Sequence, residues 1–349
     1  MHDALTALLQ QRSGVERDTW RSLWDRLDDG GLDRGEAVAL LASLATRLPD
    51  PETLRNLVAS LHERRPVVTD RWPGSVNIVG TGGGPRTFNI STASALVAAA
   101  LGVRVVKTGS RAHAGSCGSI DLLERLGIRL TSSYEHTSDT LDRVGIAFAG
   151  HFVYPTALTQ LARLIVPMSM RPFGRFLNAL GPFLAAVPVT AQVTGVSEHA
   201  PLAELRQLAA TVNDRRIWLC TNDLGADELL GFADNVIYTG EGAGGLRLWP
   251  GRFVSGAGRL DDLRSVEDPG AVVEHFLAVI SGTAHAVATQ TVCLNAAALA
   301  VASGYLDDWA TAVTAAEDAV RSGAARELVD RLRAPRQRPL SLARVAGHG

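Results

Sequence analysis

The segment VNIVGTGGGPRTFNIST, residues 76–92, decides the expected fold. The run Val76–Val79 is typical of a buried strand, the four glycines from Gly80 to Gly84 of a tight turn, and Ser91–Leu101 of an apolar helix. Glycine lets the backbone approach a ligand closely, and the amides at a helix N-terminus attract phosphate. The segment therefore predicts a strand–turn–helix unit that is either a phosphate-binding loop or an ordinary turn capped by Asn89 or Ser91.

The same alternation continues on the C-terminal side of this segment. Strand-like runs at Val103–Val106, Ile146–Phe148, Ile217–Cys220 and Val236–Tyr238 alternate with helical periodicity. This pattern predicts an α/β fold with a mostly parallel central sheet covered by helices. Residues 1 to about 68 and 271–333 have only helical periodicity, and residues 334–349 have the composition of a loose tail. In the first of these regions we expect Asp33 to cap a helix that begins near Arg34, and Pro51 to occupy the first turn of the next helix.

Composition limits the class of protein. The chain has 349 residues, enough for about two domains of ~150 residues. Its 46% hydrophobic content excludes a mainly disordered protein, and its net charge of −2 disfavours binding to nucleic acid or to an anionic membrane through bulk charge. Three scattered cysteines without a CxxC pair argue against a disulfide framework or a zinc cluster. The N-terminus lacks a signal-peptide core and the apolar runs are too short to span a bilayer, so we expect a cytoplasmic protein with no membrane partner.

A single lysine stands in a second candidate loop. Of the 34 basic residues only Lys107 is lysine, and it begins the segment KTGSRAHAGSCGSID, which follows one predicted strand and precedes a helix. Lysine is a slim point charge that can reach a phosphate in a narrow pocket, whereas arginine is broader and planar. Because the carboxyl ends of parallel strands form ligand sites, the two loops together predict a ligand with phosphates at two ends. A chance lysine and a surface Arg111 are the structural alternatives.

Adjacent carboxylates follow the strand Ile217–Cys220. Asp227 and Glu228 stand at the start of an expected helix, where acidic residues commonly stabilise the helix dipole. The functional alternative is Mg²⁺ binding, since magnesium prefers oxygen ligands and is usually shared with substrate phosphates.

These segments resemble the anthranilate phosphoribosyltransferase family. The family pattern Gly-Thr-Gly-Gly-Asp-Gly-x-x-Thr-Phe-Asn-Ile-Ser-Thr matches at residues 80–92, where Thr87–Thr92 is identical to it. The family's Lys-His-Gly-Asn-Arg begins here at Lys107, and further matches occur at Asn178–Pro182, Gln192–Val196 and Leu294–Ala297. The resemblance implies a helical domain of residues 1–70, joined by helices around 158–182 and hinged to an α/β domain of residues 71–349. It also implies a homodimer that uses Mg²⁺ and phosphoribosyl pyrophosphate.

The resemblance also implies roles for individual residues. The donor would be bound by Gly80, Thr81, Gly82, Gly83, Arg86, Thr87, Asn89, Ser91, Thr92, Lys107 and Ser119. The acceptor would be bound by Thr108, Gly109, Ser110, Arg111, Tyr154 and Arg171, and the metal by Ser91, Asp227 and Glu228.

The chain departs from the family pattern on the acceptor side and at the pyrophosphate end of the donor. The glycine loop is one residue shorter and lacks the family's Asp-Gly, while Arg86 adds a positive charge. Thr108 and Ser110 replace a family His and Asn, and Tyr154 replaces the His of a His-Pro pair. The family arginine that grips the acceptor carboxylate has Arg171 or Arg163 as candidates, while direct alignment offers Met168 or Ser169.

These departures favour a diverged, Mg²⁺-dependent glycosyltransferase that moves a phosphoribosyl or related activated sugar to a small-molecule nucleophile in specialised metabolism. Three alternatives stay open: a true anthranilate phosphoribosyltransferase of tryptophan biosynthesis, a nucleoside phosphorylase, and a non-catalytic relative that binds nucleic acid. The retained Asp227–Glu228 pair and the net charge of −2 argue against the last of these.

Overall fold

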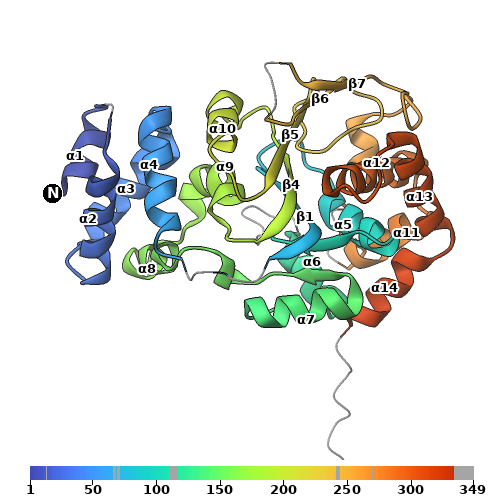
Figure 1. Cartoon of the computed structure of the whole chain (residues 1–349), viewed down its shortest axis with the longest axis horizontal. Helices are drawn as coiled ribbons and strands as arrows, with labels where there is room; N and C mark the ends of the chain where they lie inside the picture. The colour runs from blue at the N-terminus through green and yellow to red at the C-terminus, as the bar shows by residue number, and fades with distance from the viewer. Residues whose placement is uncertain are drawn as a thin grey trace, which may run out of the picture.

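The computed structural model describes residues 1–12, 14–65, 68, 71–109, 117–240, 244–266, 268 and 270–333. The chain opens with four helices that stand apart from the sheet (Figure 1). Their bounds are α1 Asp3–Leu9, α2 Arg17–Asp28, α3 Arg34–Thr46 and α4 Pro51–His62.

Sequence signals at the helix ends explain where these helices begin. Asp33 and Glu36 form a capping box at α3: the Asp33 carboxylate accepts from the Glu36 amide at 2.8 Å, and Glu36 accepts from the Asp33 amide at 3.3 Å. Pro51 occupies the first turn of α4, after the capping carboxylate of Asp50. Both starts confirm the expectation from the sequence.

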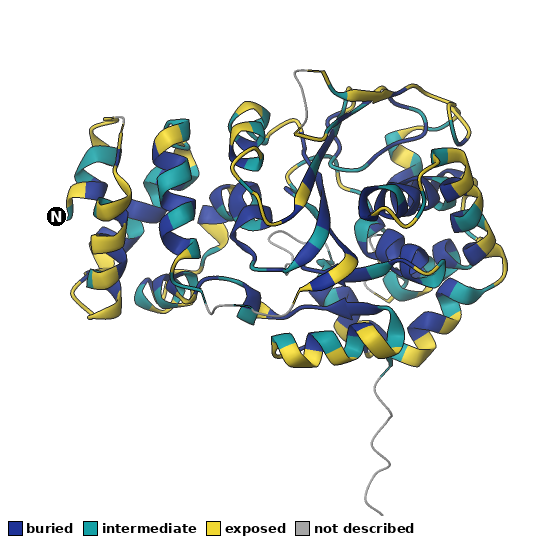
Figure 2. Cartoon of the chain, viewed as in Figure 1, coloured by how far each residue is buried: buried dark blue, intermediate teal, exposed yellow. Residues whose placement is uncertain are grey.

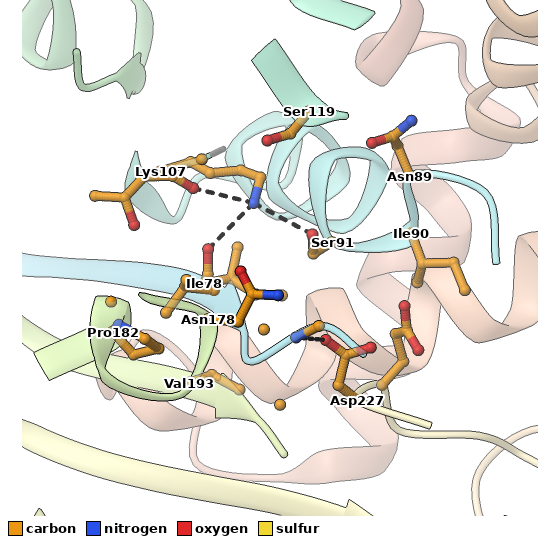
Figure 3. A pocket seen from close by; sticks show the side chains of 18 of the residues that line it. Ile78, Asn89, Ile90, Ser91, Lys107, Ser119, Asn178, Pro182, Val193 and Asp227 are labelled. Carbon is orange, nitrogen blue, oxygen red and sulfur yellow. Dashed lines mark hydrogen bonds between the residues drawn. The ribbon is translucent and has the colours of Figure 1, made fainter. Parts of the chain in front are cut away.

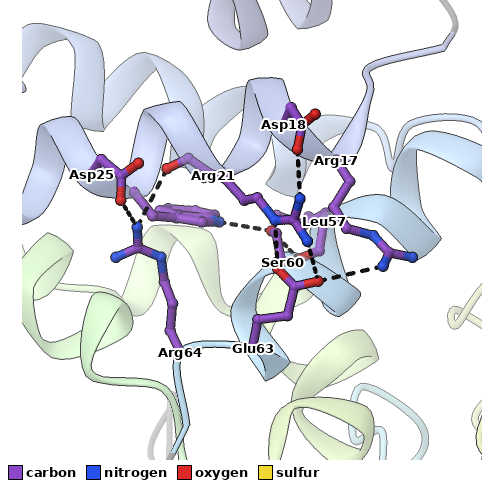
Figure 4. Close-up of polar contacts among 9 residues, drawn as sticks. Arg17, Asp18, Arg21, Asp25, Leu57, Ser60, Glu63 and Arg64 are labelled. Atoms are coloured by element: carbon purple, nitrogen blue, oxygen red, sulfur yellow. Dashed lines mark hydrogen bonds and ion pairs between the residues drawn. The ribbon is translucent and has the colours of Figure 1, made fainter.

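Polar contacts join α2 to the end of α4 (Figure 4). Arg21 donates to both carboxylate oxygens of Glu63, at 2.6 and 2.7 Å, while Arg64 pairs with Asp25 and Asp28. Beneath these exposed pairs the Trp24 indole donates to Ser60 Oγ at 2.9 Å inside the bundle. The buried bond fixes the register of the two helices, since exposed ion pairs contribute little free energy.

A seven-stranded sheet forms the centre of the α/β part, in the order β3-β2-β1-β4-β5-β6-β7. The first five strands in this order are parallel to one another. β6 pairs antiparallel with β5, and β7 pairs antiparallel with β6. Their bounds are β1 Trp72–Gly80, β2 Arg104–Lys107, β3 Ile146–Phe148, β4 Val189–Gly195, β5 Arg216–Asn222, β6 Asn235–Tyr238 and β7 Leu246–Leu248. The mostly parallel sheet is as expected, although the sequence did not indicate β4 and β7.

The helices of the α/β part contact strands β1 to β4 or pack against other helices of the same part (Figure 1). They are α5 Ile90–Ala100, α6 Ser119–Leu126, α7 Tyr134–Val144, α11 Val272–Ile280, α12 Ala286–Ser303, α13 Trp309–Arg321 and α14 Ala324–Leu332. α12 is long and apolar enough to cross a membrane by composition, yet 78% of that segment is buried inside the protein. Figure 2 shows it as one of the most buried helices, so its apolarity serves the core.

A second apolar core lies on the other side of the sheet. It joins the four N-terminal helices to α8 Thr156–Leu164, α9 Gly174–Leu184, α10 Leu202–Ala209 and the β5 residues Ile217 and Leu219. α9 contributes Phe176, Leu180 and Phe183 to this core and also contacts β1. It therefore stands between the N-terminal helices and the sheet (Figure 1).

One expectation about local structure is wrong. Asp227 and Glu228 do not begin a helix, because the chain between β5 and β6 is irregular. The segment is shaped instead by polar side chains: Asn295 of α12 accepts from the Leu229 amide at 3.1 Å and donates to its carbonyl at 2.8 Å. The two carboxylates are therefore not helix-dipole partners.

The α3 capping box yields a stability prediction. Asp33→Ala should lower the free energy of unfolding by about 1 kcal/mol, because the Glu36 amide loses its partner. Urea denaturation followed by circular dichroism measures this change. Asp29→Ala, at the exposed C-terminal end of α2, is the matched control. Equal losses for the two variants would contradict the role of the cap.

Candidate active site

A cavity of about 230 Å³ opens at the carboxyl ends of β1, β2 and β4 (Figure 3). We call it the donor cavity. Its walls come from both loops singled out in the sequence, from α9 and from the Asp227–Glu228 segment. Of the predicted site residues it brings together Gly80, Gly82, Asn89, Ser91, Lys107, Thr108, Gly109, Ser119, Tyr154, Asp227 and Glu228.

Lys107 supplies the buried positive charge of this cavity. Its side chain is 3% exposed, and Nζ donates to Ile78 O and Ser91 Oγ at 3.2 Å and to Thr108 O at 3.4 Å. Burial lowers the pKa of Lys107 to about 8, against the opposing effect of the Asp227 charge. A buried ammonium held by neutral oxygens still lacks an anionic partner in contact with it, and an incoming phosphate would provide one.

Asp227 and Glu228 supply the opposing negative charge. Asp227 Oδ2 accepts from the Gly82 amide at 2.8 Å, and Glu228 Oε1 accepts from Thr87 Oγ1 at 2.9 Å. Burial raises the pKa of Asp227, and burial together with the Asp227 charge raises the pKa of Glu228 well above its usual range. The two carboxyl groups therefore favour a shared proton in the absence of a cation.

Two strand-terminal glycines make room for Asp227. A Cβ on Gly80 would lie 2.1 Å from Asp227 Oδ2, and one on Gly195 would lie 1.6 Å from the Asp227 carbonyl oxygen. β1 and β4 both end in these glycines, so the Asp227 carboxylate lies directly against the end of β1 and the Asp227 backbone against the end of β4. Gly82 and Gly83 have φ of 60° and 83°, a left-handed conformation that suits glycine and turns the Gly82 amide toward Asp227.

The acidic pair fits a divalent cation. Glu228 Oε2 is buried without a hydrogen-bond partner, so one oxygen of the pair is available as a ligand. Ser91 Oγ lines the same cavity but accepts from Lys107. Among the described residues no cluster of three or more His, Cys, Asp or Glu could enclose a metal ion. A cation here would therefore need ligand oxygens from a substrate or from water, as Mg²⁺ commonly does.

The other predicted donor residues have varied positions. Thr81 and Gly83 face a second cavity, Thr87 reaches the site only through Glu228, and Arg86 is exposed and lines neither cavity. Thr92 is fully buried within α5, away from both cavities. Asn89 is the N-cap residue of α5, but its amide donates to Cys117 O at 3.0 Å and caps nothing.

The second cavity, of about 440 Å³, adjoins the donor cavity, because Gly82 and Asn178 line both. We call it the arginine cavity. It is lined by Arg171, just before α9, by Arg175 in the first turn of α9, and by His199. Arg163 is exposed on α8, and neither it nor Met168 and Ser169 line either cavity. Of the four candidates for binding an acceptor carboxylate, Arg171 is therefore the one that faces a cavity.

Within the donor cavity, a buried polar chain supports Thr108 and Tyr154. The Thr108 amide donates to Asn77 Oδ1 at 3.2 Å, Asn77 donates to Gln192 Oε1 at 3.3 Å, and the partly buried Tyr154 lies beside Thr108. Burial raises the pKa of Tyr154, so its hydroxyl stays neutral. The predicted acceptor residues Ser110 and Arg111 lie outside the described residues.

Two cavity residues escaped the analysis of single motifs. Asn178 approaches the glycine loop from α9, with Nδ2 3.4 Å from the place a Cβ on Gly82 would take, and lies between Lys107 and Asp227 in the view of Figure 3. Asn295 holds the Asp227–Glu228 segment from α12. Both stand in motifs that match the family, and that match was the only signal for them.

The fold and this site define a class. Residues 73–326 match the family model described as the glycosyl transferase family, a/b domain, so the chain is a glycosyltransferase of that family. A relative from Methylorubrum extorquens, an anthranilate phosphoribosyltransferase, is 32% identical over 331 residues, which cover 93% of this chain and 96% of the relative. The chain belongs to the anthranilate phosphoribosyltransferase family.

Solved structures of the family superimpose on the chain. The anthranilate phosphoribosyltransferase from Thermus thermophilus matches with a TM-score of 0.78 and 29% identity, over 95% of this chain and 100% of that one. The Saccharomyces cerevisiae enzyme, solved in complex with phosphoribosyl pyrophosphate (PRPP) and Mg, matches with a TM-score of 0.72 over 91% of each chain. Because its identity to this chain is 21%, this match supports the fold alone. The expected family, fold class and enzyme class are thereby confirmed.

The buried lysine yields a binding prediction. Lys107→Met should remove most of the rise in Tm that PRPP and Mg²⁺ cause, while the Tm of the protein alone changes little, because lost hydrogen bonds and lost desolvation cost offset each other. Thermal-shift titration measures both. Arg104→Met, which removes an exposed cation from the same strand, is the control. A large loss of stability with donor binding intact would make Lys107 a structural residue.

The acidic pair yields a pH prediction. The raised pKa of Glu228 means that a bound cation must displace a proton, so Mg²⁺ binding with the donor should release a proton and should tighten as the pH rises through the raised pKa of Glu228. Isothermal titration in buffers of different ionisation enthalpy measures both effects. Asp223→Asn, in the same segment but outside the cavity, should leave them unchanged. Affinity independent of pH would contradict the prediction.

Proposed function

We propose that this chain transfers the phosphoribosyl group of phosphoribosyl pyrophosphate (PRPP) to the amino group of anthranilate. The observation that carries the proposal is the donor cavity, where a buried lysine and a buried carboxylate pair face the same space. A donor with phosphate groups and a bound cation satisfies both charges at once. The named relatives support anthranilate, and favour it over the diverged acceptor expected from the sequence.

In this proposal each group of residues binds a different part of the donor. Lys107 holds a phosphate, the Gly82 and Gly83 loop allows the backbone to approach the pyrophosphate, and Asp227 and Glu228 hold Mg²⁺, which would offset the charge of the departing pyrophosphate. The sugar–oxygen bond breaks, the sugar–nitrogen bond forms, and the amine loses a proton. The chain contributes orientation and charge stabilisation, and the reaction needs no nucleophilic side chain.

Arg171 would hold the acceptor from the adjoining cavity. An ortho-aminobenzoate carries a carboxylate beside its amine, and a guanidinium binds a carboxylate with two parallel hydrogen bonds. The shared lining residues Gly82 and Asn178 show that the arginine cavity adjoins the donor cavity.

We also propose that the chain is divided into two domains, residues 1–70 and residues 71–349, with α9 between them. We further propose that the protein is a homodimer in the cytoplasm.

A second candidate is the same transfer to a different small amine. The wall made by Thr108 and Tyr154 favours it, because the family has histidine at both positions and a site loses binding energy when its polar partners change. The donor chemistry is the same in both candidates.

Fluorescence of anthranilate distinguishes the two candidates. Purified enzyme with PRPP and Mg²⁺ should consume anthranilate, and leaving out either PRPP or Mg²⁺ should stop the loss of fluorescence. Donor binding without anthranilate turnover would support the second candidate. Absence of both donor binding and turnover would overturn the proposed function.

The arginine cavity yields a further prediction. Arg171→Gln should raise KM for anthranilate at least about tenfold with a smaller change in KM for PRPP, since one charge-assisted contact is lost. Steady-state kinetics measure both constants. Arg163→Gln removes an arginine that lines neither cavity and should behave as wild type. The reverse pattern would assign the acceptor contact to Arg163.

A further inference from the structure

The C-terminal end of α9 is held by side chains from elsewhere in the chain. The last four carbonyl groups of a helix have no partner within it. At α9 the Gly181 carbonyl accepts from the Ala185 amide at 3.2 Å, and the next three accept from side chains. Gln192 donates to Pro182 O at 3.0 Å, His62 to Phe183 O at 2.7 Å, and Arg65 to Leu184 O. We call His62, Arg65 and Gln192 the α9 clamp.

Burial affects the pKa of the two titratable members of the clamp, His62 and Arg65. Burial lowers the pKa of His62 to about 4, so at neutral pH the ring is uncharged and its Nε2–H is the donor to Phe183. Burial and Arg215 lower the pKa of Arg65 to about 9, which leaves it charged at neutral pH. A positive charge at the negative end of a helix is favourable, more so where solvent is excluded. Gln192 is fully buried.

The clamp replaces support that α9 lacks internally. Pro182 has no N–H, so it cannot donate to the carbonyl of Asn178 one turn earlier. The helix therefore lacks one internal hydrogen bond, at the carbonyl of Asn178, and is less stable between this residue and its clamped end. External partners at the last turn compensate for that loss.

The same helix forms the shared wall of the two cavities. Asn178 approaches Gly82, while Arg175 lines the arginine cavity one turn earlier. A small rotation of α9 would move both side chains relative to the glycine loop. The clamp members come from different places: His62 and Arg65 from the end of α4 and the residues just after it, and Gln192 from β4. Gln192 also accepts a hydrogen bond from the Asn77 side chain, which in turn accepts from the amide of Thr108, next to Lys107.

We propose that His62, Arg65 and Gln192 are positioning residues, which hold α9 at the angle where Asn178 closes the donor cavity against Gly82. The inference rests on the proposed function, because PRPP is the ligand whose binding it concerns. None of the three needs to touch the donor. They act through the carbonyl groups of α9.

Paired substitutions test the clamp. His62→Leu and Arg65→Met remove the donors, while His62→Gln and Arg65→Lys keep an N–H that reaches for the same carbonyls; Gln192→Met covers the third position. The first two variants and Gln192→Met should weaken PRPP binding with Mg²⁺ and raise KM for PRPP about tenfold, with kcat less affected. They should also speed hydrogen exchange in residues 174–184. The conservative variants should restore PRPP affinity.

A matched control separates positioning from general stability. Arg216 donates to Ala302 O at 2.9 Å near the end of α12, so Arg216→Met also removes an arginine contact from a terminal helix carbonyl. It should lower Tm without changing PRPP affinity. Clamp variants that lower Tm in the same way, with PRPP affinity unchanged, would overturn the proposal. Wild-type protein that binds no PRPP would instead overturn the proposed function, and the clamp proposal with it.

Discussion

The site depends on one acidic residue, Asp227, which lies against the ends of two parallel strands. Asp227 reaches this position because β1 and β4 both end in glycine, at Gly80 and Gly195, where any side chain would collide with it. Its charge then shapes its surroundings: it accepts the Gly82 amide, raises the pKa of Glu228 and opposes the loss of charge on buried Lys107. Glycine loop, lysine and acidic pair are thus one electrostatic unit assembled from three separate segments.

How much the sequence could predict follows the range of the interactions. The strand–turn–helix at residues 76–101 and the α3 cap depend on neighbouring residues, and periodicity and cap chemistry were sufficient to predict them. β4 was missed although Thr190, Gln192 and Thr194 alternate with apolar residues, a pattern typical of a strand. Both faces of this strand are largely buried in the fold, which the alternation alone does not indicate. The segment at Asp227 was mistaken for a helix start, since its shape is set by Asn295, far along the chain. Arg171 could be separated from Arg163 only when the cavities were visible.

The helix α9 connects the apolar core of the N-terminal helices to the site. The helix buries Phe176, Leu180 and Phe183 among the N-terminal helices, yet it presents Asn178 to the donor cavity. The polar chain from Gln192 through Asn77 to Thr108 crosses three adjacent strands without a formal charge. Uncharged, mutually bonded groups can lie beneath a charged site with little desolvation cost, and among the described residues they leave Lys107 as the lysine or arginine that lines the donor cavity.

The scarcity of lysine makes the intact chain its own chemical reporter. Acylating reagents attack neutral amines, and apart from the amino terminus the only primary amine in this sequence is Lys107. Its pKa of about 8 gives it a larger neutral fraction near neutral pH than an ordinary lysine has, while its burial limits a reagent to moments when the cavity is open. The mass of the peptide that contains Lys107 would then record how often the cavity opens and what protects it, in unaltered protein and without an introduced label.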